Sequence, residues 1–296
     1  MIVSPVAAMQ APTLCVSSGA ARPRRRHGLW AMGVAMWYTL LLGANQAMAA
    51  LSDEELAKLA QNPVGNLISV PFQNNANLND GPLKQNQDVL NIQPVIPIDF
   101  SPDWNIITRT ILPVISQPAL FPGQARVYGI GPTQLSAFLS PANPHGVIWG
   151  LGAITQIPSE TQLELGSDRW GAGPTAVILH LTQGSPWVYG VLVNNVWSFT
   201  NGPGGSYNSF LAQPFLNYNF ESHKGTYLTS SPIITANWQA KGRDVWTVPV
   251  GGGIGHIFHL GRLPMNSQIA AYYNAATPQF GPNWQIRAQV QFMFPK

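Results

Sequence analysis

The sequence predicts an all-β fold, an antiparallel transmembrane β-barrel of about 12 strands preceded by a short N-terminal helix. Three observations favour it. Charged residues make up 9% of the 296-residue chain while the mean hydropathy is +0.04, whereas a typical soluble domain is roughly 25% charged. Segments of about ten to fourteen residues, the length of tilted transmembrane strands, recur between turn residues. Tryptophans gather at the ends of those segments.

The first fifty residues have the three parts of a secretory signal. Four arginines within 22–26 precede an apolar run over 29–44, and Ala47-Met48-Ala49 supplies a small-residue cleavage site. The apolar run is shorter than the roughly 20 residues of a transmembrane helix. We therefore predict a cleaved signal peptide over residues 1–49. An uncleaved anchor and a mitochondrial or plastid address are the alternatives, and Met9 is a second possible start.

Charge and cysteine content change when the leader is set aside. The whole chain has a net charge of +3, but removing the four leader arginines leaves 11 basic against 12 acidic residues. The basic isoelectric point therefore does not indicate nucleic-acid binding. The only cysteine, Cys15, lies in the leader, so the mature chain has neither disulfides nor thiol chemistry. We expect no cofactor and no metal.

Residues 50–65 are predicted to form a periplasmic lead-in with a short helix. Ser52 and Glu55 have the spacing of a capping box, and Leu56 and Leu59 follow on one face. The helix is expected to end before Asn62-Pro63. Whether this helix rests at the barrel mouth, plugs the lumen or is a simple lead-in stays open.

Residues 66–296 are predicted to form the barrel. Alternation is clearest over 283–294, where Trp284, Ile286 and Val290 share one face and glutamines occupy the other. It is weakest over 88–100 and 103–115. The expected strands are 66–77, 88–100, 103–115, 132–141, 146–157, 170–182, 187–198, 208–220, 226–238, 244–258, 265–277 and 283–294.

Connection lengths predict which way the barrel points. The connections 78–87, 116–131, 158–169 and 199–207 are long, and those between them are short. Long outer loops that alternate with short periplasmic turns place both termini in the periplasm.

Prolines inside the expected strands require bulges or interrupted pairing, because proline cannot donate to a strand ladder. They are Pro94, Pro97, Pro113, Pro174, Pro214, Pro232 and Pro249.

Two sets of residues are predicted to face lipid headgroups and the barrel interior. The membrane-interface aromatics are Trp104, Trp170, Trp187, Trp197, Trp238, Trp246 and Trp284. Neutral amides with two arginines are expected to line a wet path for polar solutes; alternatively, they knit together and fill a closed interior. These lumen candidates are Gln93, Arg109, Gln134, Gln213, Asn217, Gln268, Asn274, Gln285, Arg287, Gln289 and Gln291.

Other chemistries have weaker support. Gly251 to Gly255 lacks the lysine of a phosphate loop and favours tight curvature instead. His256 and His259 are three apart, so on a strand they point to opposite faces. A hydrolase needs a serine, a histidine and an orienting group, and no nucleophile motif accompanies His180 or His256. A soluble periplasmic β-sandwich is a further alternative, because it shares the period-two alternation.

Nine long stretches of the chain have wording typical of a known family. They are QNPVGNLISVPFQNN (61–75), VLNIQPVIP (89–97), TRTILPVISQP (108–118), LSAFLSPANP (135–144), WGAGPTAV (170–177), WVYGVLVNNVWS (187–198), QPFLNYN (213–219), YLTSSPIITANW (227–238) and WTVPVGGGIG (246–255). These stretches resemble a family of Gram-negative outer-membrane proteins catalogued as transporters, near the phenol-degradation meta-pathway barrels. Many of its members carry the label "neuromedin U", the name of an unrelated animal hormone. The resemblance implies a barrel in the cell outer membrane but no catalytic residues.

The sequence thus predicts a passive, porin-like channel or transporter for small molecules, and not an enzyme. A non-conducting ligand-binding or structural barrel and an outer-membrane hydrolase are the alternatives. The expected partners are outer-membrane lipid, the barrel-assembly machinery and a small-molecule solute, with no nucleic acid. One departure from barrel habit is that Phe294 is followed by Pro295-Lys296 rather than ending the chain.

Overall fold

The computed structural model describes residues 51–144, 146–182 and 184–295. The chain divides into two units, and the first, Met1–Gly43, lies outside these residues together with the predicted signal peptide. The described part begins with helix α2 (Asp53–Ala60). Ser52 caps it through the predicted capping box with Glu55. No helix among the described residues is long and apolar enough to cross a membrane.

After α2, the described part of the second unit is one closed antiparallel β-barrel. Its fifteen strand segments occupy 12 positions around the barrel, because three pairs of short segments each continue one another. The segments are β1 (Leu67–Asp80), β2 (Gln85–Ile92), β3 (Val95–Asp99), β4 (Trp104–Gln117), β5 (Val127–Ile130), β6 (Thr133–Pro141), β7 (Val147–Ile157), β8 (Gly171–Leu181), β9 (Trp187–Ser198), β10 (Asn208–Asn219), β11 (Thr226–Ser230), β12 (Ile234–Asn237), β13 (Trp246–Leu260), β14 (Leu263–Ala276) and β15 (Trp284–Pro295).

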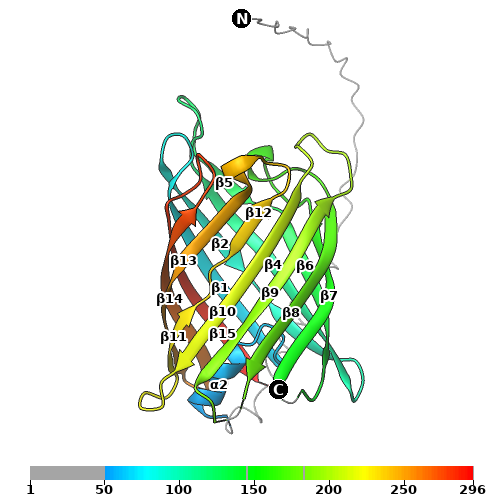
Figure 1. Cartoon of the computed structure of the whole chain (residues 1–296), viewed down its shortest axis with the longest axis vertical. Coiled ribbons are helices and arrows are strands. Elements are labelled where there is room, and N and C mark those ends of the chain that lie inside the picture. The colour runs from blue at the N-terminus through cyan, green and yellow to red at the C-terminus, as the bar shows by residue number, and fades with distance from the viewer. Residues whose placement is uncertain (1–50, 145, 183, 296) are drawn as a thin grey trace, which may run out of the picture. The chain divides into compact units, whose positions relative to one another are not determined.

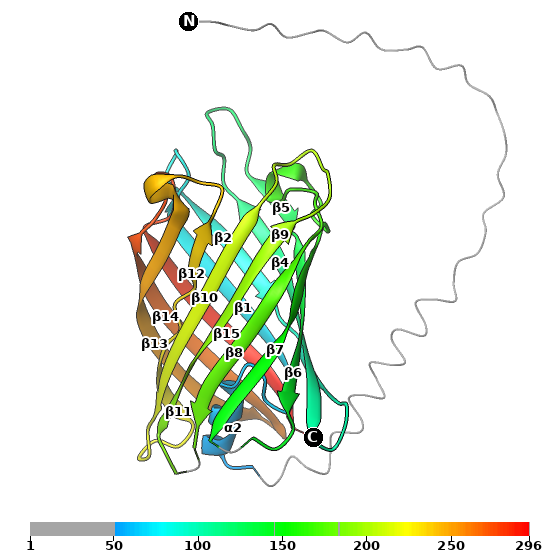
Figure 2. The same ribbon diagram turned by 45° about the vertical axis from the view of Figure 1, so that its right-hand side comes forward.

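The first and last strands close the barrel. β1 and β15 pair continuously from Leu67 opposite Pro295 to Leu78 opposite Trp284. Figures 1 and 2 show the strands tilted around a common axis, with α2 at the end where β15 finishes. We name this the helix end. The opposite end, the loop end, carries the connections 118–126, 158–170, 199–207 and 238–245.

The predicted strand segments agree with this architecture, with two corrections. All twelve expected ranges coincide with the twelve strand positions. One correction is that β4 runs to Gln117 and β5 pairs with it inside the predicted loop 116–131, so that connection is only 118–126. The other is that the range 78–87 is not a long loop. β1 continues to Asp80 and β2 starts at Gln85, so only residues 81–84 form the turn. Asparagine and aspartate at 77, 79 and 80 read as turn residues in the sequence, but they extend the strand past a register shift.

Prolines account for the interrupted strands. The gaps β2/β3, β5/β6 and β11/β12 contain Pro94, Pro132 and Pro232, respectively. At Pro249 the β13–β14 register shifts instead. A residue without an amide hydrogen cannot continue the ladder, so pairing stops or slips there. Pairing therefore stops or slips at Pro94, Pro232 and Pro249, as predicted. The expectation is wrong for Pro97, Pro113 and Pro214, which stay paired in an unshifted register.

The outer surface of the barrel is apolar. Large hydrophobic side chains at every second position of the strands are exposed, whereas their sequence neighbours are buried inside. A soluble sheet would bury this face, so its exposure around a closed barrel fits contact with lipid chains. Exposed examples are Ile96, Ile98, Leu135, Leu139, Leu151, Ile178, Leu216, Leu228, Val250, Ile254, Ile269 and Val290.

Candidate functional site: the barrel lumen

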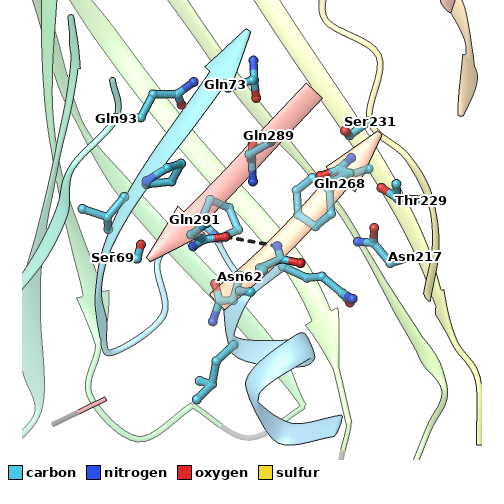
Figure 3. Close-up of a pocket in the computed structure, with 18 of the residues that line it drawn as sticks. Asn62, Ser69, Gln73, Gln93, Asn217, Thr229, Ser231, Gln268, Gln289 and Gln291 are labelled. Atoms are coloured by element: carbon cyan, nitrogen blue, oxygen red, sulfur yellow. Dashed lines mark hydrogen bonds between the residues drawn. The ribbon is translucent and has the colours of Figure 1, made fainter. Parts of the chain in front are cut away.

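The interior of the barrel has two chemically different sides. On β1, β14 and β15 most of the polar inward side chains are amides. We call them, together with Arg287, the polar wall: Gln73, Asn75, Asn266, Gln268, Arg287, Gln289 and Gln291. Several of them hydrogen-bond one another. Gln73 donates to Asn75 over 3.3 Å, and Asn266 donates to Gln291 over 3.2 Å. Such bonds hold the amides against the wall, as Figure 3 shows for the bond accepted by Gln291 on β15.

The facing side is hydrophobic. Strands β4 and β6 to β10 contribute a buried cluster that we call the apolar wall: Ile107, Phe138, Ile148, Val177, Leu179, Val188, Leu192 and Phe215. Ile107 and Val188 have no exposed surface. A packed core on one side narrows the lumen and leaves the open space beside the amides. This asymmetry also explains the weak alternation of 103–115, because both faces of β4 carry aliphatic residues.

Two cavities occupy the remaining space. The lower cavity, nearer the helix end, has a volume of about 150 Å³ and lies between the polar wall and residues 59–63. The upper cavity measures about 380 Å³ and extends towards Pro132 and Ile233. Both are lined by Gln73, Gln93, Arg109, Leu192 and Gln213. These shared residues mark the level at which one cavity adjoins the other.

Arg287 is the buried cation of the polar wall. Its side chain is 1% exposed, and its donors are engaged. Nε donates to Asn75 over 3.1 Å, one terminal nitrogen donates to the Ser231 carbonyl over 2.8 Å, and the other donates to Gln285 over 3.1 Å. The guanidinium also lies 4.8 Å from the centre of the Tyr272 ring. No carboxylate is among these partners, so the positive charge is uncompensated there.

Arg109 is the second cation, on β4. Its guanidinium donates to the side-chain oxygen of Gln93, which is the only hydrogen bond of this group within the described residues. Gln93 precedes Pro94, and Ser231 precedes Pro232. Each lumen arginine therefore donates to a residue at a proline-made strand gap. At the second gap the backbone carbonyl of Ser231 accepts the bond, whereas at the first gap the acceptor is the side chain of Gln93.

The N-terminal segment, residues 51–66, crosses the lumen at the helix end. Leu56 and Ala57 of α2 pack against Leu67, Tyr227, Ile257 and Met293 on one side. Beyond the helix, Val64 packs into the apolar wall on the other side. A segment buried against opposite walls obstructs the passage between them.

Polar contacts fix this segment further. The Gln61 and Asn219 side chains exchange two hydrogen bonds, of 2.9 and 3.2 Å. Asp53 lies 3.6 Å from His259 on β13. The segment is therefore held to the wall by apolar and polar contacts together.

The structure places the predicted lumen residues as follows. Asn274 lies on an inward position nearer the loop end and donates to the Pro282 carbonyl, and Gln285 joins Arg287 to Asn77. Sequence reasoning missed Gln73, Asn75, Asn266 and the whole apolar wall. The remaining predicted residues line one or both cavities: Gln93, Arg109, Gln134, Gln213, Asn217, Gln268, Arg287, Gln289 and Gln291.

The predicted interface tryptophans lie on the outer surface near strand ends. Trp170, Trp197, Trp238, Trp246 and Trp284 lie at the loop end and are each more than one third exposed. At the helix end, Trp104 packs edge-on against Trp149, and Trp187 packs against Tyr218. Two aromatic groups thus flank the apolar band, the arrangement found at the two interfaces of membrane barrels. Their depth in a bilayer stays a prediction.

The histidines and glycines have local roles. His256 faces outward and shares a hydrogen bond of 2.9 Å with the Thr226 hydroxyl, whereas His259 reaches Asp53 at the mouth, so the two point apart as predicted. Gly255 faces inward. A Cβ there would lie 2.2 Å from the Tyr227 ring, so this glycine provides room for the tyrosine rather than curvature alone.

Comparisons with known proteins support the fold. No protein-family model and no curated protein sequence matches the chain. Among solved structures, the chain is similar to an outer membrane channel from Pseudomonas putida F1, with 17% identity, a TM-score of 0.58, and coverage of 79% of this chain and 96% of that one. It is less similar to outer membrane phospholipase A from Escherichia coli, with 13% identity, a TM-score of 0.42, and coverage of 83% and 98%. The fold is therefore that of an outer-membrane β-barrel.

Proposed function

We propose that this protein is an outer-membrane channel that passes small polar molecules, exported with a cleaved signal peptide over residues 1–49. The carrying observation is the pair of adjoining cavities inside a closed barrel, lined by hydrogen-bonding amides and two arginines. Amides both donate and accept, so they replace water around a passing solute. The likeness to an outer membrane channel is consistent with this proposal.

The obstruction at the helix end has to move for solutes to pass. The N-terminal segment is short, and it belongs to none of the strands, so its displacement leaves the barrel ladder intact. We therefore propose a channel closed at rest by residues 51–66. The resemblance to the outer-membrane transporter family seen in the sequence agrees with a transport role.

Planar-bilayer recordings test this proposal. The full chain is compared with a variant that lacks residues 52–62. We expect low conductance from the full chain and a several-fold higher conductance from the deletion variant. Folding of both is verified by the altered gel migration of unboiled barrels. A correctly folded deletion variant without conductance would contradict a channel.

A non-conducting barrel is the second candidate, and the closed helix end favours it. In that case the cavities are binding spaces without an exit, and the deletion variant stays electrically silent. We further propose that the chain is not an enzyme. A lipid-hydrolysis assay tests this, with His180→Ala and His256→Ala as the informative variants. Hydrolysis that either substitution abolishes would overturn it.

A further inference from the structure

The charge balance of the lumen indicates which solutes it accepts. The residues that line the two cavities include two arginines and no aspartate, glutamate or lysine. Acidic residues of the described chain lie instead on α2, in turns and loops, or at strand positions that line neither cavity. In a space walled by protein rather than water, an uncompensated positive charge raises the local concentration of anions.

The two arginines differ in what they offer to a ligand. Arg287 uses its donors on Asn75, Ser231 and Gln285 and is 1% exposed, so it contributes charge but few free donors. Arg109 is only partly buried, lines both cavities, and donates to Gln93 alone among the described residues. A guanidinium carries five N–H donors in a planar fork that fits a carboxylate. Arg109 therefore has donors available to a bound anion.

The surroundings of Arg109 restrict the rest of the ligand. In the upper cavity the guanidinium shares its space with amides and hydroxyls and with an apolar part that includes Ile111, Phe138 and Leu192. A strongly hydrated dianion would lose its hydration water against the apolar residues. These side chains form no hydrogen bonds that offset the free-energy cost of that desolvation. A single carboxylate on an apolar body places its charge on Arg109 and its body on Phe138 and Leu192, the apolar-wall residues that line this cavity. The cavity volume of about 380 Å³ lies in the range of small-molecule sites.

We propose that the upper cavity is a binding site for small monocarboxylates with an apolar body, and that Arg109 binds the carboxylate. Gln93 orients the guanidinium, and Arg287 adds positive potential from the adjoining lower cavity. This proposal rests on the proposed function in one respect: it names the solute that the channel would pass. Binding of the monocarboxylate at this site does not require the barrel to conduct.

The test uses the full chain purified in detergent, with hexanoate as the probe and hexanamide as its neutral analogue. Titration calorimetry at pH 7.5 should show saturable hexanoate binding and little hexanamide binding. In Arg109→Gln the hexanoate affinity should fall about tenfold or more, the effect of losing charge-assisted hydrogen bonds. Arg109→Lys, which keeps the charge without the fork, should be intermediate. Arg262→Gln removes a charge from an exposed turn and should change nothing.

Each result separates the site from the channel. Hexanoate binding that Arg109→Gln leaves unchanged, or that hexanamide matches, overturns the site. All three variants, Arg109→Gln, Arg109→Lys and Arg262→Gln, are first checked for the heat-dependent migration of a folded barrel. A loss of binding is then not a loss of fold. If wild type binds hexanoate through Arg109 but the deletion of 52–62 does not conduct, the site stands and the proposed channel fails. If the barrel conducts but titration calorimetry shows equal binding of hexanoate and hexanamide, only the site fails.

Discussion

The side chains of Gln61 and Asn219 form a reciprocal amide pair, each donating one hydrogen bond to the other over 2.9 and 3.2 Å. The first residue follows α2 and the second ends β10, so this pair fastens the N-terminal segment to the barrel wall. Asn219 also donates to the Pro186 carbonyl over 3.0 Å, which holds its side chain in place. The pair is therefore a preorganised latch at the helix end.

Breaking this latch should favour the open channel. Gln61→Ala removes both hydrogen bonds, each worth about 0.5–1.5 kcal/mol net, so the ratio of open to closed channels should rise about fivefold to a hundredfold. Single-channel recordings measure that ratio directly. Gln279→Ala, at an exposed position in the loop before β15, is the matched control and should behave as wild type. An unchanged open population in Gln61→Ala would show that the pair does not hold the segment.

Docking of α2 should depend on Leu56. Its side chain is 2% exposed and packs in one cluster with Tyr227, Ile257 and Met293. Leu56→Ala should weaken docking by about 2–5 kcal/mol, because a cavity replaces the lost methyl groups. Limited proteolysis followed by mass spectrometry should then cut within residues 51–66 much faster. Leu83→Ala, in the exposed turn after β1, should leave the cleavage rate unchanged. Equal rates in both variants would rule out the packing argument.

Gly255 should not tolerate a side chain. A Cβ at this position would lie 2.2 Å from the Tyr227 ring, which passes over the glycine to donate to Asn266 over 2.9 Å. Gly255→Val should displace the ring and destabilise the barrel by about 1–3 kcal/mol. The measurement is the temperature at which the folded gel band disappears. Gly205→Val, in a loop with open space around the glycine, should leave that temperature unchanged. The same loss in both variants would contradict the assignment.

The capping box should make the start of α2 sensitive to acid. Hydrogen bonds from the Ser52 backbone and side chain lower the pKa of Glu55 below its ordinary value of 4.5. Because the folded pKa is the lower one, the contribution to helix stability is present above pH 4.5 and is lost as the pH falls through the folded pKa. The amide resonance of Ser52, followed by NMR in micelles, should titrate below pH 4.5. A midpoint at or above 4.5 would contradict the capping interaction, and Glu55→Gln should abolish the titration.

Arg169 should order the loop 199–207. Its guanidinium donates to the carbonyls of Gly204, Thr200 and Gly202 over 2.7, 3.1 and 3.0 Å. Nearby, burial and the charge of Glu160 raise the pKa of Tyr207 to about 12. Arg169→Ala should leave three carbonyls without this partner and increase amide hydrogen exchange across the loop about tenfold. Arg243→Ala, on an exposed loop, is the control. Unchanged exchange in Arg169→Ala would mean that the loop is ordered by other contacts.

Much of the barrel was predictable because its signals are local. Strand length, alternation and turn residues are properties of neighbouring positions, and they located all twelve strand positions. The alternating amides of β15 identified Gln289 and Gln291 as inward residues. The apolar wall was not predictable in this way, because β4 places aliphatic residues on both faces and its period-two signal disappears. Gln73 and Asn75 were missed although the signal is present: Val70, Phe72 and Ala76 alternate with polar residues along β1.

The sequence by itself determined the class of fold, the capped helix and the inward face of the strands that alternate clearly. These depend on a few adjacent residues and on the physics of a strand between lipid and water. Only the tertiary structure decided where those elements meet. It placed α2 across the lumen and brought Arg109 to Gln93, and Arg287 to Ser231, at the gaps made by Pro94 and Pro232. Arg109 and Gln93 meet because β2 and β3 pair directly with β4. Arg287 and Ser231 are separated by β13 and β14, and they meet because the sheet curves around the lumen.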